Sequence, residues 1–471
     1  MIPGSPSRTL LQATYLLSPF RMCKWLSYFL ALRQHLTLCR WADGLGNLHE
    51  NALPECQLEL IQSRVDAIFP DSERQPVPFW MDTLCIPVAD EHKPLRNKSI
   101  KMMRQIYGGA EAVLVLDASL QQFSLSSNTS ETSLALFLSH WIHRLWTCQE
   151  AMFAKKLYFW FKDGPLYNAD FEQVVKKEKE ANIEKGLHGS FQSVMHTAVL
   201  KALTTLKVVV DMKFGTPALL LAPLADCIQQ RTATRISDEA ICSAMILDLE
   251  TEDMLAVETK DVSEESIAEM RMVIFLKQMG KFPQGMIFHH NKRMRTEGYR
   301  WAPRTYMGLE ARHLVGDMHN NSTSTFKGKG LSVQYPGFIL ENVPPESGDK
   351  ITVTMKHSEH RYSLQLFPED AKADSAGASY PWDPNTVYAV LLTRTVSSRM
   401  SSTGTDALVG ILMDPAEVRE EQGKRRRKGT LNMTVKVKCE CRAHMEGLDL
   451  GLSTDQSVVE LLAKEQKWRV Y

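Results

Sequence analysis

Short apolar runs alternate with helical patterns between residues 37 and 164, and this alternation restricts the possible folds more than any other feature of the chain. Runs typical of strands occur near residues 37–41, 77–82, 112–117 and 157–161, and helical patterns begin at Pro54 and cover about residues 95–107 and 134–155. Strands that alternate with helices are typical of a parallel sheet covered on both faces. The sequence therefore predicts an α/β fold with a parallel sheet flanked by helices.

The pattern changes twice after this region. Between residues 165 and 310 helical patterns dominate, and helices are expected to begin at Ser237 and Ser263, because acidic residues follow each serine. Beyond Gly330, short alternating segments separated by Pro, Gly and charged residues are typical of β structure. We therefore expect an atypical N-terminal segment at 1–36, the α/β domain at 37–164, a helical extension at 165–310 and a β-rich C-terminal domain at 311–471.

Charge and cysteine content indicate which partners and which cellular compartment are expected for the chain. It has 55 Lys plus Arg and 55 Asp plus Glu, so no net field attracts nucleic acid. Arg21, Lys24 and Arg33 interrupt the best apolar stretch, so no membrane span is predicted. The 9 cysteines lack the spacing of a disulfide framework, which favours a reducing, cytoplasmic compartment.

Acidic and small residues follow three of the expected strands. Asp43 and Gly44 follow the first, Asp82 and Thr83 the second, and Asp117 the third. Because ligands bind at the carboxyl ends of parallel strands, these residues are expected to lie at one edge of the sheet and to form a site. The alternative is that the aspartates only cap helices and turns.

Other chemical motifs favour packing over catalysis. Cys439, Cys441 and His444 form a CxCxxH pattern, but a strand would point both thiols to one face, so no metal site is expected. Cys85 has no histidine nearby in the sequence, which favours a buried thiol over a nucleophile. The chain contains no P-loop and no dinucleotide-binding glycine pattern, and no bound cofactor is expected.

Several motifs together resemble the fungal heterokaryon-incompatibility (HET) domain and its usual downstream region. In chain order they are ADGLGN at 42–47, NALPECQL at 51–58, FWMDTLC at 79–85, IYGGAEAVLVLD at 106–117, RLWTCQEA at 144–151 and EGYRWAP at 297–303. The resemblance covers about residues 41–310. It implies a role in fungal non-self recognition, in which the HET domain is the toxic effector of programmed cell death.

The first 42 residues depart from the family pattern. They contain five Lys or Arg and no acidic residue, and residues 35–41 read HLTLCRW where HET domains usually open with a strand similar to LSHVW. Three interpretations stay open: a wrongly joined or divergent start, a targeting peptide of the basic and acid-poor type, and a surface helix. A ligand contact from Trp41 depends on which of them holds.

A more distant pattern is similar to the TIR domain, which has a flavodoxin-like parallel sheet. Its sugar-nucleotide-cleaving members use the glutamate of a W-x-x-x-E helix, and Trp146 and Glu150 have that spacing. The resemblance implies that Glu150 is catalytic and stabilises the positive charge that develops on the ribose of NAD as the bond to nicotinamide breaks. The loop at 118–133 is longer than in most TIR domains.

The same resemblance implies a substrate site around Glu150. Its predicted members are Trp41, Asp43, Gly44, Asp82, Thr83 and Trp146. Trp41 or Trp146 would stack on a ring of the substrate. The alternative for Glu150 is an ion pair with Arg144 or another neighbouring basic residue that fastens the helix.

Three functional hypotheses follow. The chain is an NAD glycohydrolase triggered by self-assembly, with NAD as substrate; it is a non-catalytic interaction domain that signals by oligomerising; or it is a divergent, inactive family member. Whether it is an enzyme stays open. The expected partner is a second copy of the chain or another incompatibility protein. For a shared site, the side chains of Asp82 and Glu150 should open into one cleft, with carboxylates within about 15 Å of each other.

Overall fold

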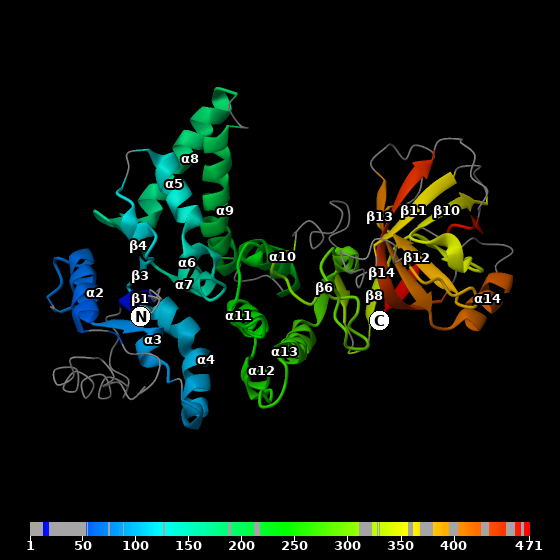
Figure 1. Ribbon diagram of the computed structural model, residues 1–471, viewed down its shortest axis with the longest axis horizontal. Helices are drawn as coiled ribbons and strands as arrows, with labels where there is room; N and C mark the ends of the chain where they lie inside the picture. Colours follow the sequence, from blue (N-terminus) through cyan, green and yellow to red (C-terminus); the bar gives the residue numbers. More distant parts are fainter. Residues whose placement is uncertain are drawn as a thin grey trace, which may run out of the picture. The chain divides into compact units, whose positions relative to one another are not determined.

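The chain forms two compact units. Unit 1 comprises Met1–Lys213 and Gln230–Leu255, and unit 2 comprises Phe214–Gln229 and Ala256–Tyr471 (Figure 1). The computed structural model describes residues 13–17, 53, 55–73, 76–87, 89–125, 128–186, 190–211, 217–309, 323–326, 328, 330–356, 361–367, 380–394, 404–424, 433–448, 457–462 and 466–471. The four-part division expected from the sequence stays a prediction.

Unit 1 contains a mixed five-stranded sheet. Its strands are β1 (Ala13–Leu17), β2 (Phe79–Met81), β3 (Ala112–Leu116), β4 (Leu157–Phe161) and β5 (Gly164–Tyr167). They lie in the order β2-β1-β3-β4-β5, in which only β3 and β4 pair in parallel. The TIR-like or flavodoxin-like arrangement stays a prediction, because three of the four strand pairs are antiparallel. The combination of this sheet with helices confirms the α/β class. Because the strand directions differ, the predicted parallel sheet is corrected to a mixed one.

Two features of the chain explain why the sheet is mixed. The strand that pairs antiparallel with β2 and β3 comes from residues 13–17, whereas the strand predicted near 37–41 lies outside the described residues. Only Lys162 and Asp163 connect β4 to β5, and so short a connection makes an antiparallel hairpin. The parallel pair β3 and β4 is separated by a helical crossover, as parallel pairing requires.

Helices lie on both faces of this sheet. Those of unit 1 are α2 (Glu55–Ile68), α3 (Asp82–Cys85), α4 (Lys93–Gly109), α5 (Thr129–Leu138), α6 (His140–His143), α7 (Thr147–Phe153), α8 (Asn168–Glu184), α9 (Phe191–Asp211), α11 (Asp238–Ile246) and α12 (Glu252–Ala256), which ends at the unit boundary. Val65 of α2 packs with Leu114 of β3 in one core cluster. On the opposite face of the sheet, the ring of Trp141 in α6 lies 5.3 Å from that of Phe159 in β4.

The single helix predicted over residues 134–155 is wrong, because the chain there forms α5, α6 and α7. Ser139 separates the first two: its hydroxyl donates to the Leu136 carbonyl at 2.7 Å and accepts from the Ile142 N–H at 3.4 Å. The buried carboxylate of Asp117 accepts from the Trp141 N–H at 2.9 Å. These bonds satisfy backbone groups at the helix ends and make the break stable.

Unit 2 contains a mixed nine-stranded sheet, so the predicted β-rich C-terminal region is confirmed. The sheet order is β15-β10-β11-β14-β13-β12-β9, and β16 pairs with β14 and β8. Its strands are β8 (Leu331–Gln334), β9 (Gly337–Leu340), β10 (Lys350–Met355), β11 (Arg361–Phe367), β12 (Tyr388–Leu392), β13 (Thr405–Leu412), β14 (Val435–Leu448), β15 (Ser457–Val459) and β16 (Lys467–Val470). The pairs β10–β15 and β14–β16 are parallel and the other pairs are antiparallel.

The remaining elements of unit 2 precede or flank this sheet. They are α10 (Pro217–Ile228), α13 (Glu264–Met279), α14 (Pro415–Lys424), the 3-10 helices Gln284–Phe288 and Pro345–Ser347, and the strand pair β6 (Lys281–Pro283) and β7 (Thr323–Thr325). As predicted, α13 begins after Ser263, whose hydroxyl accepts from the Ser266 N–H, and Gly280 ends it with φ +63°. In the described part of the chain, no helix combines the length and the apolar character needed to cross a membrane.

Candidate functional site

Glu150, the predicted catalytic residue, is buried within unit 1. It belongs to α7, and only 4% of its surface is exposed. The indole Nε1 of Trp141 donates to its Oε2 at 2.9 Å, and the Tyr107 hydroxyl donates to Oε1 at 3.5 Å, the long limit for such a bond. A buried carboxylate is costly unless it accepts hydrogen bonds, so these donors explain how the charge is tolerated. We refer to Tyr107, Trp141 and Glu150 as the Glu150 cluster.

Tyr107 is the titratable donor of this cluster. It lies near the end of α4, has no exposed surface, and its ring meets that of Trp80 edge to face at 5.9 Å. Burial, followed by the negative charges of Glu150 and Asp82, raises the pKa of Tyr107 well above its usual range, and Arg144 opposes the shift. The hydroxyl therefore keeps its proton at neutral pH and remains able to donate to Glu150.

Asp82, which directly follows β2, influences the pKa of the same tyrosine. Its negative charge raises this pKa together with the larger contribution of Glu150. Asp82 also accepts from its neighbour Thr83, at 2.6 Å from the backbone N–H and 3.2 Å from the hydroxyl. These contacts join adjacent residues of α3, whose N-cap residue Met81 makes no side-chain capping bond, so Asp82 does not cap this helix. A common cleft for Asp82 and Glu150 stays a prediction.

Trp146 and Asp117 have partners away from the Glu150 carboxylate. Trp146 precedes α7, and its indole Nε1 donates to Asp238 Oδ2 at 2.9 Å. Asp117 is fully buried, and its Oδ1 accepts from the Ser119 N–H at 2.8 Å, so it caps the turn after β3. Stacking of Trp146 on a substrate ring would have to accommodate the bond to Asp238.

The other three predicted substrate-binding residues are Trp41, Asp43 and Gly44. All three lie outside the described residues. The roles that the TIR resemblance gives them stay predictions.

Sequence reasoning missed the two donors that hold Glu150. Residue patterns single out neither Tyr107 nor Trp141 as a hydrogen-bond donor. Trp141 reaches Glu150 because the chain breaks at Ser139 and turns again before α7. An indole or phenol near a buried acid in an apolar segment is the signal that could have indicated such donors.

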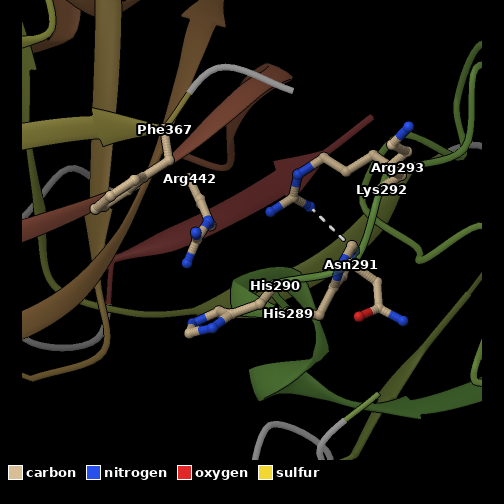
Figure 2. A pocket seen from close by; sticks show the side chains of 7 residues that line it. All are labelled: His289, His290, Asn291, Lys292, Arg293, Phe367 and Arg442. Atoms are coloured by element: carbon tan, nitrogen blue, oxygen red, sulfur yellow. Dashed lines mark hydrogen bonds between the residues drawn. The ribbon is translucent and has the colours of Figure 1, made fainter. Parts of the chain in front are cut away.

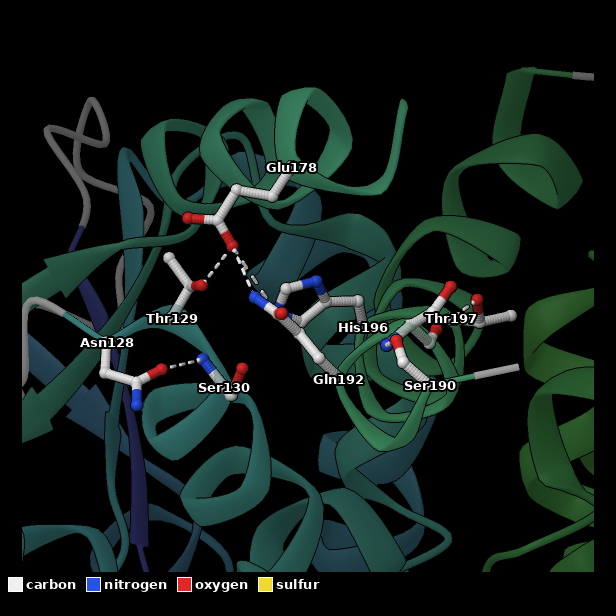
Figure 3. Close-up of polar contacts among 9 residues, drawn as sticks. Asn128, Thr129, Ser130, Glu178, Ser190, Gln192, His196 and Thr197 are labelled. Carbon is white, nitrogen blue, oxygen red and sulfur yellow. Dashed lines mark hydrogen bonds and ion pairs between the residues drawn. The ribbon is translucent and has the colours of Figure 1, made fainter. Parts of the chain in front are cut away.

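A second, partly buried polar cluster joins α5, α8 and α9 (Figure 3). The carboxylate of Glu178 accepts from the Thr129 hydroxyl and from the Gln192 side-chain amide, the latter at 3.2 Å. Nε2 of the fully buried His196 lies 3.8 Å from Glu178 Oε2, beyond hydrogen-bond length. Burial lowers the pKa of His196 more than Glu178 raises it, so the histidine is neutral at pH 7 and this cluster fastens three helices without a charged pair.

The CxCxxH motif is part of the sheet of unit 2. Cys439 and Cys441 are buried on β14, in agreement with the packing role expected from the sequence. Among the described residues, no group of three or more His, Cys, Asp or Glu side chains is arranged to hold a metal ion.

Cys85 is expected to react slowly with iodoacetamide at pH 8. Burial, with a smaller contribution from Asp82, raises the pKa of its thiol to about 12, so very little thiolate is present. Cys56 is exposed on α2 and serves as the internal control. Alkylation followed by peptide mass spectrometry should show Cys85 at least about tenfold slower, after allowing for the higher intrinsic reactivity of a high-pKa thiolate. Equal rates would restore Cys85 as a candidate nucleophile.

The comparisons with known proteins identify one part of the chain. Residues 44–132 match the family model described as heterokaryon incompatibility protein (HET), which confirms the HET resemblance for this segment. The matched segment includes Asp82, Tyr107 and Asp117 and ends before Trp141 and Glu150. No curated protein and no solved structure matches the chain significantly. The TIR resemblance therefore stays a prediction.

Proposed function

We propose that this protein acts in heterokaryon incompatibility as a HET effector that brings about cell death by assembling with further copies of itself, without catalysing a reaction. The observation that carries the incompatibility role is the HET match over residues 44–132. The family role suggested by this match is incompatibility, and the death of non-self fusion cells is the outcome that we assign to it.

The surroundings of Glu150 favour the non-catalytic form of the proposal. A glutamate that acts on a ribose must reach the substrate within hydrogen-bond distance. Glu150 is buried, and its two carboxylate oxygens accept from Trp141 and Tyr107. The same contacts are what a charged group needs if its role is to hold α4, α6 and α7 together.

NAD glycohydrolysis is the second candidate function, and one observation favours it. The negative charges of Asp82 and Glu150 both raise the pKa of Tyr107, which supports a common electrostatic environment for the acid after β2 and the acid of α7. In this hypothesis Glu150 would stabilise the charge that develops on the ribose, after the Tyr107 contact of 3.5 Å opens. NAD would be the substrate, consumed rather than held as a cofactor.

Induced expression in a filamentous fungus tests both candidates. The chain is produced as wild type, as Glu150→Gln, and as Glu180→Gln, which changes an exposed glutamate on α8. The proposal predicts that all three kill, with cellular NAD undiminished before membrane damage. If wild type lowers NAD and Glu150→Gln, folded at the same level, loses about 100-fold or more of this activity, the glycohydrolase candidate replaces ours. A wild-type chain that does not kill overturns the effector role itself.

A further inference from the structure

A basic pocket lies within unit 2, far along the chain from the HET match. It has a volume of about 190 Å³ and is lined by His289, His290, Asn291, Lys292, Arg293, Phe367 and Arg442 (Figure 2). Five of these seven side chains can carry positive charge, and none of the seven is acidic. We refer to this set of residues as the basic pocket.

Two different parts of the fold supply these residues. The segment from His289 to Arg293 follows the 3-10 helix Gln284–Phe288, while Phe367 and Arg442 are directly paired across β11 and β14. The guanidinium of Arg442 lies over the Phe367 ring, 4.3 Å from its centre. This stacking orients the planar guanidinium, which leaves its N–H groups available at the edges for a ligand.

The buried side chain of Arg293 is held in place by hydrogen bonds. Only 3% of its surface is exposed, and it donates to the Ile287 carbonyl at 2.8 Å and to the Arg300 carbonyl at 3.4 Å. Nε2 of His289, itself 1% exposed, lies 3.4 Å from Arg293 Nη1. A charged group held by its own backbone neighbours is pre-organised, so little side-chain entropy is lost when it binds a ligand.

The two arginines repel each other across this small space. Burial lowers the pKa of Arg442, Asp406 raises it, and the charge of Arg293 lowers it further. An arginine remains charged despite such a shift. Asp406 offsets the charge of Arg293, and burial remains the largest influence on Arg442, so a bound anion would add to the compensation that Asp406 already gives this buried charge.

We propose that the basic pocket binds the phosphate or pyrophosphate group of a small-molecule ligand. Its volume is below the roughly 300–1,000 Å³ of pockets that enclose drug-sized ligands, so the charged group enters and the rest of the ligand extends outside. Arg442 supplies N–H donors that suit phosphate oxygens, and exposed Lys292 and His290 lie at the rim. Arg293 adds a fixed positive charge, while its own Nη groups donate to the Ile287 and Arg300 carbonyls. This site is separate from the Glu150 cluster and does not depend on the proposed function.

Isothermal titration calorimetry of the full chain with sodium pyrophosphate, at ionic strength held constant with NaCl, tests the site. Arg442→Gln is expected to weaken binding by about 10- to 100-fold, the effect of losing a hydrogen bond to a charged group. Arg295→Gln removes an exposed positive charge outside the pocket lining and should leave affinity within about twofold. Inorganic phosphate, ADP and adenosine are titrated in parallel: tighter binding of ADP than of pyrophosphate identifies a nucleotide, and the reverse identifies a free phosphate compound.

Lys292→Gln keeps the test decisive if Arg442→Gln does not fold. Lys292 is exposed, so its replacement should spare folding and still weaken pyrophosphate binding by a few fold. The proposal is overturned if the wild type does not bind pyrophosphate up to about 10 mM. It is also overturned if Arg295→Gln loses as much affinity as the pocket variants, or if adenosine binds as well as ADP.

Discussion

Replacing Glu150 with alanine is expected to lower the free energy of unfolding of unit 1 by about 2–4 kcal/mol. The change leaves the Trp141 indole N–H and the Tyr107 hydroxyl buried without the carboxylate that accepts from them. Each buried donor that loses its acceptor costs about 1–3 kcal/mol, and removal of the buried charge offsets part of the sum. Urea unfolding followed by fluorescence and circular dichroism measures the change.

Two further variants show whether the effect belongs to these hydrogen bonds. Glu150→Gln keeps an oxygen that can accept from Trp141 and an amide that can donate to Tyr107, so it should cost less than Glu150→Ala. Glu180→Ala removes an exposed glutamate from α8 and should change stability by less than about 0.5 kcal/mol. Equal stability of wild type, Glu150→Ala and Glu180→Ala would exclude a structural role and strengthen the case for catalysis.

Most of the local structure could be predicted from residue patterns. The apolar run at 112–117 forms β3, all five residues of which are buried, and the run at 157–161 is β4. Helices begin at Glu55 and Glu264, one residue after the predicted starts at Pro54 and Ser263. These elements were predictable because the spacing of apolar residues within each short segment indicates whether it forms a strand or a helix.

Strand direction and helix breaks could not be predicted in the same way. A buried strand shows the same run of apolar residues whether it pairs in parallel or antiparallel. The sequence therefore could not show that β1 is antiparallel to β2 and β3. The break at Ser139 depends on Asp117, which is distant in sequence and accepts from the Trp141 N–H. Contacts of this kind are visible only once the chain has folded.

The acidic residues of the candidate site could be predicted from the sequence, but their burial and hydrogen-bond partners could not. The strand end at Asp82 and the W-x-x-x-E spacing indicated residues that both act on Tyr107. The burial of Glu150 and the bond from Trp146 to Asp238 depend on tertiary packing, for which the spacing of four residues gives no signal. For the same reason the basic pocket was not foreseen, since Arg293 and Arg442 are separated by most of unit 2 in sequence.

Replacing Trp301 with alanine is expected to have the largest effect on unit 2, lowering its free energy of unfolding by about 3–5 kcal/mol. Trp301, in the EGYRWAP motif, has no exposed surface and packs its ring 4.9 Å from Phe282 and 5.3 Å from Phe326. Its indole donates to the Gly298 carbonyl at 3.0 Å, so alanine also removes a buried donor.

Two control variants separate these contributions. Trp301→Phe keeps an aromatic ring and should cost about half as much. Met413→Ala changes a side chain that is 46% exposed and should cost less than about 0.5 kcal/mol. A Trp301→Ala protein as stable in urea as Met413→Ala would contradict the core role of this residue.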